Sequence, residues 1–302
     1  MKKILFVQLP PPRFIFEDSG ANIPLAAGFL ASCIKSQEPL KFETEILGSD
    51  VVDVLADAGI IREITQRSPD ILAMTLYLWN SQRSLFIATA VKRLLSNVKV
   101  IVGGPDVTPD NSWLIRHPAI DIGVFGEGEP QFVSALNEIV SPEKHGPCSL
   151  NSCEAERVIF KPRNKSMKDW DLGQAGYPYV NGIIGASRNG SIFLETVRGC
   201  PFKCKYCYYH KAFDSVRSYP MTLVEEVLDF AYLQKNRVNE IYLMDPTFNA
   251  RKGFRDILKS MASRRRNHDI KIHTELRADL LTDGDVRLFK EAGLVSAEIG
   301  LQ

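Results

Sequence analysis

The chain lacks any apolar stretch long enough to form a membrane helix, and it carries almost no net charge. Lys2 and Lys3 precede four apolar residues, as at the start of a signal peptide, but that run stops at Gln8 and the prolines at 10–12. So short a run argues against a secretory signal, and nowhere do about 20 apolar residues follow one another. With 37 Lys and Arg against 36 Asp and Glu, the formal net charge is +1, which argues against a nucleic-acid-binding surface. We therefore expect a cytoplasmic protein that binds neither membranes nor nucleic acids.

Cysteine is scarce too, with 6 in 302 residues. A chain of this length buries about three quarters of the surface that its unfolded form exposes, so it needs no disulfides to fold. Without a signal peptide we expect a reducing compartment, which argues against disulfides as well. Cys33 lies in a helical stretch and is expected to be a small core residue. Cys148 and Cys153 lie in a polar stretch without a partner pattern, which leaves three cysteines to explain.

The three remaining cysteines form a C-x3-C-x2-C array at Cys200, Cys204 and Cys207. The array directly follows an apolar β-type run at 192–197, and a glycine and a proline flank its first cysteine. The strand is therefore expected to end there, with the cysteines on a tight loop. Such short spacings let one loop surround a single metal centre with thiolates. Because there are three thiolates and not four, a four-iron cluster bound here would keep one iron open for a ligand that is not protein.

Zinc is the main alternative at this loop. A structural zinc site takes four ligands, and His210, three residues after Cys207, is a candidate for the fourth. The spacing, with Tyr206 just before the third cysteine, resembles the cluster loop of the radical S-adenosylmethionine (SAM) superfamily. The resemblance implies that Cys200, Cys204 and Cys207 ligate a [4Fe–4S] cluster and that Tyr206 lies near the adenine of SAM. In that superfamily the open iron chelates SAM, and an electron from the cluster cleaves it to a 5′-deoxyadenosyl radical.

In the first half of the chain, β-type runs alternate with helical ones. Strands are predicted at 3–9, 42–47, 71–78, 98–102 and 120–125, and helices at 23–35, 51–67, 81–95 and 131–140. The run at 71–78 is almost continuously apolar, as in a strand that is covered on both faces. This alternation predicts an α/β domain over 1–140 with a mostly parallel, doubly wound sheet of the Rossmann or flavodoxin-like type. Ligands of such sheets lie beyond the carboxyl ends of the strands.

Glycine, proline and uncharged polar residues gather in the segments that follow these strands. Three segments, 77–80 (Y-L-W-N), 102–106 (V-G-G-P-D) and 126–130 (G-E-G-E-P), resemble in order and spacing the B12-binding domain that precedes the barrel in one subclass of radical SAM enzymes. Taken singly, they are ordinary turn residues. The resemblance implies that cobalamin contacts a set of strand-exit residues: Gln8, Pro10, Tyr77, Trp79, Asn80, Gly103, Gly104, Pro105, Gly126, Glu127, Gly128 and Glu129.

One departure from that subclass pattern concerns the lower ligand of cobalt. Many cobalamin domains carry D-x-H-x-x-G after the first strand, where the histidine binds cobalt, but 8–13 reads Q-L-P-P-P-R here. His117, the only histidine before residue 141, lies in another loop. We therefore expect cobalamin to bind without a protein histidine on cobalt. The alternative is a vestigial first domain that binds no cofactor, since a likeness in fold does not establish a ligand.

A polar linker is predicted at 141–190, with a short strand at 155–161 and a β-hairpin around Asn189 and Gly190. The β/α rhythm then resumes over 191–302, with strands at 240–244, 270–276 and 295–301. Helices are predicted at 223–234, around 254–261 and at 282–292, the first with a capping box of Thr222 and Glu225, the last capped by Thr282 and Gly293. The resemblance implies a (β/α) radical SAM barrel, which usually has six units. Only four strands are visible, so we expect a partial barrel, truncated after the fourth strand.

Strand exits line the active sites of β/α barrels, and several polar residues stand at such exits here. The candidate SAM contacts besides Tyr206 are Asp245, Pro246, Thr247, Glu275, Arg277 and Glu298. The first three occupy the place where the superfamily usually has a Gly-Gly-Glu stretch that contacts the amino group of SAM, so their role is a hypothesis. The last three are candidate ligands of SAM or substrate, and equally candidate partners in surface ion pairs.

Together these features predict a cobalamin-dependent radical SAM enzyme that methylates or rearranges its substrate at an unactivated carbon. One alternative is a radical SAM enzyme whose first domain binds no cofactor, and another is a non-enzymatic, zinc-binding interaction module. The expected partners are a small-molecule substrate and an external electron donor such as a flavodoxin or ferredoxin. Neither the substrate nor the donor can be read from the residues.

Overall fold

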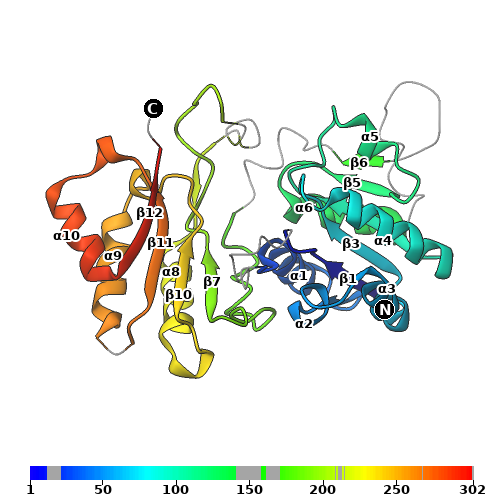
Figure 1. Cartoon of the computed structure of the whole chain (residues 1–302), viewed down its shortest axis with the longest axis horizontal. Coiled ribbons are helices and arrows are strands. Elements are labelled where there is room, and N and C mark those ends of the chain that lie inside the picture. Colours follow the sequence, from blue (N-terminus) through cyan, green and yellow to red (C-terminus); the bar gives the residue numbers. More distant parts are fainter. Residues whose placement is uncertain are drawn as a thin grey trace. The chain divides into compact units, whose positions relative to one another are not determined.

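The computed structural model of the chain describes residues 1–11, 22–140, 158–160, 171–207, 209, 213, 215–266 and 268–300. The chain forms two compact units, Met1–Trp170 and Asp171–Gln302 (Figure 1). The domain boundaries predicted at residues 140 and 190 remain predictions. His210, the candidate fourth zinc ligand, lies outside the described residues, as do Cys148 and Cys153.

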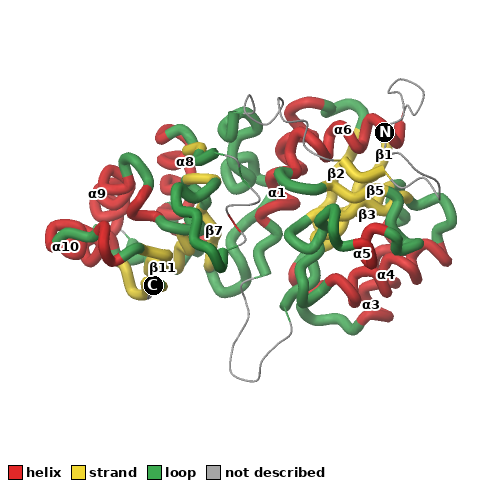
Figure 2. The backbone as a smooth tube through the Cα atoms, turned by 90° about the horizontal axis from the view of Figure 1, so that it is seen from above, coloured by secondary structure: helices red, strands yellow, loops and turns green. Residues whose placement is uncertain are grey.

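The first unit is built around one parallel sheet with the strand order β2-β1-β3-β4-β5-β6. Its strands are β1 (Lys2–Val7), β2 (Phe42–Ile46), β3 (Ile71–Thr75), β4 (Lys99–Gly103), β5 (Ile122–Val124) and β6 (Val158–Phe160). Its helices are α1 (Leu25–Gln37), α2 (Ser49–Val52), α3 (Asp57–Arg67), α4 (Ser81–Leu94), α5 (Ser112–Ile115) and α6 (Gly128–Val140). Figure 2 shows α1 and α6 on one face of the sheet and α3 and α4 on the other. The predicted doubly wound α/β class is confirmed.

The apolar runs of the sequence explain why this sheet is covered on both faces. Residues 71–74 of β3 are all buried, as are residues 4–7 of β1, and strands of parallel sheets between two helix layers read as continuous apolar runs. The chain steps from β1 outward to β2 and then returns across β1 to β3. The exits of β1 and β3 therefore flank the point where the strand order reverses, which is where open α/β sheets bind their ligands.

The second unit contains a smaller parallel sheet with the strand order β12-β11-β10-β7. Its strands are β7 (Ser191–Leu194), β10 (Glu240–Leu243), β11 (Lys271–Leu276) and β12 (Leu294–Ile299). Its helices are α8 (Met221–Tyr232), α9 (Phe254–Arg265) and α10 (Asp283–Ala292), with single turns η1 (Gln234–Asn236), η2 (Phe248–Ala250) and η3 (Ala278–Leu280). Buried residues alternate with more exposed ones along β10 and β11. Because successive side chains of a strand point to opposite faces, one face of this sheet is covered and the other is more open.

A second, very short sheet lies between β7 and α8 in the sequence. It pairs β8 (Val197–Arg198) with β9 (Arg217–Ser218) in antiparallel fashion, Val197 opposite Ser218 and Arg198 opposite Arg217. The sequence analysis missed this pair, because two residues are too few to show the alternation that marks a strand.

The predicted hairpin around Asn189 and Gly190 is wrong. A turn does form there, with the Gly190 N–H donating to the Ser187 carbonyl at 2.9 Å. The described residues before it form turns and bends, however, and β7 pairs in parallel with β10. An Asn-Gly pair specifies a tight turn, but a hairpin also needs a strand on its N-terminal side.

Two tyrosines from the predicted linker cover the outer edge of β7. The Phe193 N–H donates to the hydroxyl of Tyr179 at 3.0 Å, and the Glu195 N–H donates to the hydroxyl of Tyr177 at 2.7 Å. Both tyrosines are almost fully buried. Their hydroxyls therefore satisfy amide donors that an edge strand would otherwise leave unpaired.

The helix ends follow the sequence only in part. Thr282 caps α10 through a capping box with Asp285, and Gly293 ends it at a φ of 103°, as predicted. The capping box of Thr222 and Glu225 was wrong, because α8 already begins at Met221. Cys33 is buried in α1, as expected of a core residue. Within the part of the chain that the structure describes, no helix combines the length and the apolar character needed to cross a membrane.

Candidate functional site

The three cysteines lie on a loop at the carboxyl end of β7, which we call the cysteine loop (residues 199–216). It runs from β8 to β9, so the two-residue pair of strands joins its ends. The side chains of Cys200, Cys204 and Cys207 are all partly accessible to solvent. The N–H of Cys207 donates to the carbonyl of Cys204 at 3.0 Å, which makes a turn between the second and third cysteine.

Gly199 brings the two arms of the cysteine loop together. Its φ is 92°, and a Cβ atom at this position would lie 2.4 Å from the Ser215 carbonyl oxygen. Any other L-residue would be strained by its backbone angles and would also collide with the opposite arm. The glycine before the first cysteine is therefore required by the closed geometry of the loop.

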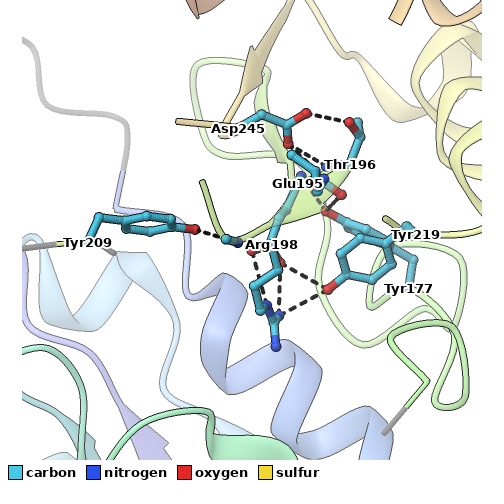
Figure 3. Close-up of polar contacts among 9 residues, drawn as sticks. Tyr177, Glu195, Thr196, Arg198, Tyr209, Tyr219 and Asp245 are labelled. Atoms are coloured by element: carbon cyan, nitrogen blue, oxygen red, sulfur yellow. Dashed lines mark hydrogen bonds and ion pairs between the residues drawn. The ribbon is translucent and has the colours of Figure 1, made fainter. Parts of the chain in front are cut away.

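Asp245 follows β10 and binds the segment in front of the cysteine loop. Its side chain, which is 0% exposed, accepts hydrogen bonds from the N–H groups of Thr196 at 2.7 Å and Val197 at 3.0 Å, and from the Thr196 hydroxyl (Figure 3). Burial raises the pKa of Asp245 to about 6, although these hydrogen bonds act to lower it. Both carboxylate oxygens are thus used within the protein, and the contact of Asp245 with SAM remains a prediction without support from this geometry.

Glu195, Arg198 and Tyr219 form a second network of hydrogen bonds around the segment in front of the cysteine loop. Arg198 donates from Nη2 to Glu195 at 2.8 Å and to the Tyr219 hydroxyl at 3.0 Å, and that hydroxyl donates to Glu195 at 2.9 Å (Figure 3). The side chains of Arg198 and Glu195 are only 8% and 16% exposed. Because Glu195 precedes β8 and Tyr219 follows β9, the hydrogen bonds of Tyr219 join the residues on either side of the short sheet.

Two of the predicted SAM contacts lie against the cysteine loop. The Thr247 hydroxyl lies 3.9 Å from the Cys200 sulfur. The Arg277 guanidinium lies 4.1 Å from the centre of the Phe202 ring. Its ion pair with Asp279 raises the pKa of Arg277, and the nearby thiols of Cys204 and Cys200 add to that effect.

Asn249 fixes the backbone of Arg277. Its side-chain nitrogen donates to the Arg277 carbonyl at 2.8 Å, and its oxygen accepts from the Arg277 N–H at 3.0 Å. The exit of β10 and the exit of β11 are therefore joined by a pair of hydrogen bonds. The sequence analysis did not select Asn249.

The other predicted SAM contacts are distributed around the open end of the sheet. Glu275 and Glu298 are neighbours in register on β11 and β12, and burial together with the charge of Glu298 raises the pKa of Glu275. Tyr206 is 74% exposed, and Pro246 is partly exposed. The structure therefore brings Thr247 and Arg277 to the cysteines and pairs the two glutamates on adjacent strands.

In the first unit, Asn80 joins the exits of two strands. Its buried side chain accepts from the Tyr77 N–H at 2.8 Å and donates to the Leu9 carbonyl at 3.0 Å. The Ser81 hydroxyl extends this connection to the exit of β4, since it lies within hydrogen-bond range of the Tyr77 carbonyl and the Asp106 carboxylate. The exits of β1, β3 and β4 are thus connected by neutral side chains and one carboxylate.

Several predicted cobalamin contacts are engaged within the fold itself. Gln8 donates to the side-chain oxygen of Asn22 at 3.0 Å, and its carbonyl accepts from the Asn22 amide at 3.1 Å. Gly104 has a φ of 111°, and a Cβ atom there would lie 2.5 Å from the Leu76 carbonyl oxygen. This glycine is therefore needed for the packing of two loops, whether or not a ligand is bound.

The remaining predicted contacts differ in their exposure. Trp79 stacks on Tyr77 with ring centres 4.5 Å apart and is 51% exposed, and the adjacent Leu78 is 87% exposed. Pro105 and Gly126 are exposed and Pro10, Gly103 and Gly128 partly so, whereas Glu127 and Glu129 are buried. Large apolar side chains in solvent at the ligand-binding edge of a sheet indicate a binding surface. This edge fits a broad, largely apolar ligand such as a corrin ring.

The cysteine loop suits an iron–sulfur cluster by its donor set. In a four-iron cluster each thiolate binds a different iron, so three thiols on one loop supply three of its four ligands. His210, the fourth ligand that a tetrahedral zinc site would need, lies outside the described residues.

Family models match both units of the chain. Residues 22–136 match the model of the B12 binding domain, and residues 194–302 match that of the radical SAM superfamily. The chain therefore carries a B12-binding domain followed by a radical SAM domain. Its cofactor class is accordingly that of a [4Fe–4S] cluster, SAM and cobalamin, and a zinc-binding interaction module is not favoured.

Individual relatives agree with this assignment. The chain is 26% identical to the cobalamin-dependent radical SAM methyltransferase TokK of Streptomyces tokunonensis, over 87% of this chain and 38% of that protein. It is also 26% identical, with the same coverage, to a 2-(S-pantetheinyl)-carbapenam-3-carboxylate methyltransferase of Streptantibioticus cattleyicolor. The chain thus spans 38% of the length of these curated relatives.

A solved structure shares the fold. The radical SAM methyltransferase TsrM of Kitasatospora setae, solved with tryptophan and a SAM analogue, superposes with a TM-score of 0.72 at 17% sequence identity. The match covers 99% of this chain and 59% of TsrM. The predicted fold, a doubly wound parallel sheet followed by a second β/α unit, is thereby confirmed.

Sequence reasoning missed most of the residues that support the cysteine loop. Arg251, just after η2, is one of them: it is only 8% exposed and donates from Nε and Nη2 to the carbonyls of Thr196 and Tyr219, both at 3.3 Å. An arginine between a short turn and a helix reads as a surface residue, so the sequence held no indication of it. The sequence contained a weak indication of Glu195 and Arg198, because charged residues are rare in a run that otherwise reads as a buried strand.

Proposed function

We propose that this chain supplies the cofactor-binding part of a cobalamin-dependent radical SAM enzyme, which methylates an unactivated carbon of a small molecule. The observation that carries the proposal is the closed loop with three thiols and no more, at the carboxyl end of β7 and beside Thr247 and Arg277. When bound, the [4Fe–4S] cluster would supply the electron that cleaves SAM to a 5′-deoxyadenosyl radical, and cobalamin would carry the methyl group.

The residues of the second unit would hold the cluster and SAM. Cys200, Cys204 and Cys207 would each bind one iron as thiolates, which leaves the fourth iron for SAM. Thr247 next to Cys200 could donate a hydrogen bond to a cluster sulfur or to SAM. Arg277 places a fixed positive charge at the loop, where it attracts a carboxylate. Glu275 and Glu298 are acceptors for SAM or substrate.

The first unit would position cobalamin through its exposed strand exits. Tyr77, Leu78 and Trp79 present apolar surface there, and residues 8–13 contain no histidine that could bind cobalt from below. Such a surface would exclude water from one face of a bound ring. Rearrangement of the substrate in place of methylation is a second outcome that the same cofactor set permits.

The proposal also implies a partner. The cluster must be reduced by a one-electron donor, and a flavodoxin or ferredoxin is the expected class. The substrate is a small molecule.

Anaerobic purification and reconstitution with iron, sulfide and hydroxocobalamin tests the proposal. We expect 5′-deoxyadenosine to form from SAM after reduction with dithionite, and cobalt to be retained by the chain. A Cys204→Ala variant should form less than a hundredth as much 5′-deoxyadenosine. Cys33→Ala, a change at a buried cysteine of the other unit, is the matched control and should behave like the parent. Equal SAM cleavage by the Cys204→Ala variant would overturn the proposed cluster, and the absence of bound cobalt from active protein would overturn the role of the first unit.

A further inference from the structure

The ends of the cysteine loop are joined by very little regular structure. β8 and β9 contribute two residues each, and the ladder continues with one further hydrogen bond, from the Tyr219 N–H to the Thr196 carbonyl at 3.0 Å. A two-stranded ladder this short is not stable alone in water. We call Thr196, Val197 and Tyr219 the loop base, because the chain enters and leaves the cysteine loop through them.

Asp245 binds the entering side of the loop base. It accepts from both successive N–H groups, Thr196 at 2.7 Å and Val197 at 3.0 Å, on the same carboxylate oxygen, while its other oxygen accepts from the Thr196 hydroxyl. Figure 3 shows the Asp245 side chain pointing toward Thr196. No other side chain among those described donates or accepts at these two amides. One carboxylate therefore holds both of these N–H groups of the entering strand.

Arg251 binds the entering and leaving sides together. Its Nε donates to the Thr196 carbonyl at 3.3 Å, its Nη2 to the Tyr219 carbonyl at 3.3 Å, and its Nη1 to the Lys252 carbonyl at 2.9 Å. The planar guanidinium fixes the directions of its N–H groups. One side chain thus holds two carbonyls, one on each side of the loop base, at a set separation.

Charged groups in such positions are unusual. Asp245 is 0% exposed and Arg251 is 8% exposed. Burial disfavours the charged forms of both: it raises the pKa of Asp245 and lowers the pKa of Arg251, and the charge of Asp245 counteracts the latter shift. Apolar side chains of similar volume would often be at least as stable as buried charged groups. Both side chains bind mainly to main-chain groups of the loop base, which indicates that their role is to hold these groups in place.

We propose that Asp245 and Arg251 are positioning residues that close the loop base, so that the three thiols are already arranged as one ligand set when metal arrives. Closure of the loop is a property of the metal-free chain. Its consequence for the iron–sulfur cluster rests on the proposed function. Neither residue is proposed to touch the cluster, SAM or substrate.

Limited digestion of the metal-free protein by trypsin tests the closure directly. Lys203 and Lys205 are exposed on the cysteine loop, and cleavage after them requires that the loop opens locally. We expect the Asp245→Ala variant to be cut there about tenfold faster than the parent. Asp245→Asn is the rescue variant: its amide oxygen can accept from both N–H groups, and its nitrogen can donate to the Thr196 hydroxyl. It should be cut within about twofold of the parent rate.

Two controls separate local opening from loss of the fold. Asp256→Ala removes an exposed carboxylate on α9, whose side chain is 69% exposed, and it should leave the cleavage rate unchanged. Mass spectrometry of the fragments distinguishes cleavage after Lys203 and Lys205 from cleavage after Lys235, an exposed lysine outside the loop. Equal acceleration at all three lysines would mean global unfolding and would overturn the positioning role. Equal rates for Asp245→Ala and the parent would overturn it as well.

Iron uptake tests the consequence. With iron and sulfide limiting under anaerobic conditions, Asp245→Ala should bind less than half the iron of the parent, and Asp245→Asn should match the parent. Arg251→Met should resemble Asp245→Ala, with Arg266→Met, a change at an exposed arginine, as its control. Equal iron uptake by all variants would overturn the preorganisation of the ligands. Failure of the parent itself to bind iron would contradict the proposed function and leave the digestion result to decide on the loop.

Discussion

At the exit of β3 the neutral amide of Asn80 connects two strand ends, whereas at the exit of β10 the buried carboxylate of Asp245 binds the base of the cysteine loop. The two sites need different degrees of support. In the first unit the binding segments leave a six-stranded parallel sheet whose ladder already fixes them. In the second unit a long loop depends on two strands of two residues. The hydrogen bonds of Asp245 and Arg251 supply support that this short ladder lacks.

The two sites also differ in the kind of ligand that they suit. The edge of the first unit presents exposed apolar side chains, Leu78 and Trp79, to a broad surface. The cysteine loop presents three thiols, whose separation must match a small inorganic cluster. A large ring tolerates small shifts of the residues around it, but a cluster does not, because each metal–ligand bond has a narrow range of lengths. We infer that the cysteine loop is the more rigid of the two sites, because a cluster requires fixed distances between its ligands.

Removing Arg251 should produce the largest effect. The Arg251→Met change leaves the carbonyls of Thr196 and Tyr219 without these donors and Asp245 without a nearby positive charge, and we expect a loss of about 3–5 kcal/mol in the free energy of unfolding of the second unit. Hydrogen exchange of peptides from β10 and α9 measures this loss. All three tryptophans, Trp79, Trp113 and Trp170, precede residue 171, so tryptophan fluorescence in urea should report an unchanged first unit. A loss of less than about 1 kcal/mol in the free energy of unfolding of the second unit would contradict the proposed difference in support between the two units.

The pH dependence of stability should come next. The pKa of Asp245 is about 6 in the folded state, against an ordinary value of 3.8. Between pH 4 and 6 the folded state therefore keeps a proton that the unfolded state has lost, so stability falls as the pH rises, by about 3 kcal/mol in total. The charge of Glu195 adds to this upward shift, and the charge of Asp245 in turn acts to raise the pKa of Arg251. Asp245→Asn should lack this slope when the second unit's hydrogen exchange is compared across the range, and parallel curves for variant and parent would show that Asp245 titrates normally.

Asn80 should have a smaller effect, in the first unit alone. Asn80→Ala leaves the Tyr77 N–H and the Leu9 carbonyl unpaired in a buried site, which costs about 2 kcal/mol. Urea unfolding followed by tryptophan fluorescence measures it, and Asn97→Ala, at an exposed turn residue, should change stability by less than about 0.5 kcal/mol. A cost equal to that of Arg251→Met would show that neutral and charged connections matter equally.

The exposed ion pairs should contribute least. Asp256 and Lys259 form a pair whose side chains are 69% and 67% exposed, and such pairs contribute about 0.5 kcal/mol or less. Asp256→Asn should therefore leave the unfolding of the second unit unchanged within error in hydrogen exchange. A larger loss would mean that charge as such, and not burial, distinguishes the two units.

The sequence was enough to predict which residues carry the chemistry of the site. It did not predict which residues hold them in place. The spacing of Cys200, Cys204 and Cys207 is local, so it could be read without a structure, and the alternation of apolar runs was enough for the fold class. Asp245 was selected as a SAM contact because polar residues at strand exits often bind ligands. Whether such a carboxylate faces a ligand or its own loop depends on how strand exits lie in space, and no pattern along the chain encodes that.

For the same reason, the sequence could not predict contacts between side chains and main-chain groups that lie far away along the chain. Arg251 binds carbonyls 55 and 32 residues away in the sequence, and a lone arginine carries no periodicity. Tyr177 and Tyr179 were assigned to a linker because prolines and glycines surround them, yet their hydroxyls complete the edge of β7. Side chains that satisfy distant backbone groups can be recognised only when both partners are placed.

The central claim is that the three thiols hold a four-iron cluster whose fourth iron is free to bind SAM. Electron paramagnetic resonance of the anaerobically reconstituted, dithionite-reduced protein, recorded with and without SAM, tests it most directly. We predict the signal of a reduced [4Fe–4S] cluster whose g values shift when SAM is added, because SAM binds the open iron. A cluster signal that SAM leaves unchanged, or a protein that takes up zinc and gives no signal, would contradict the account.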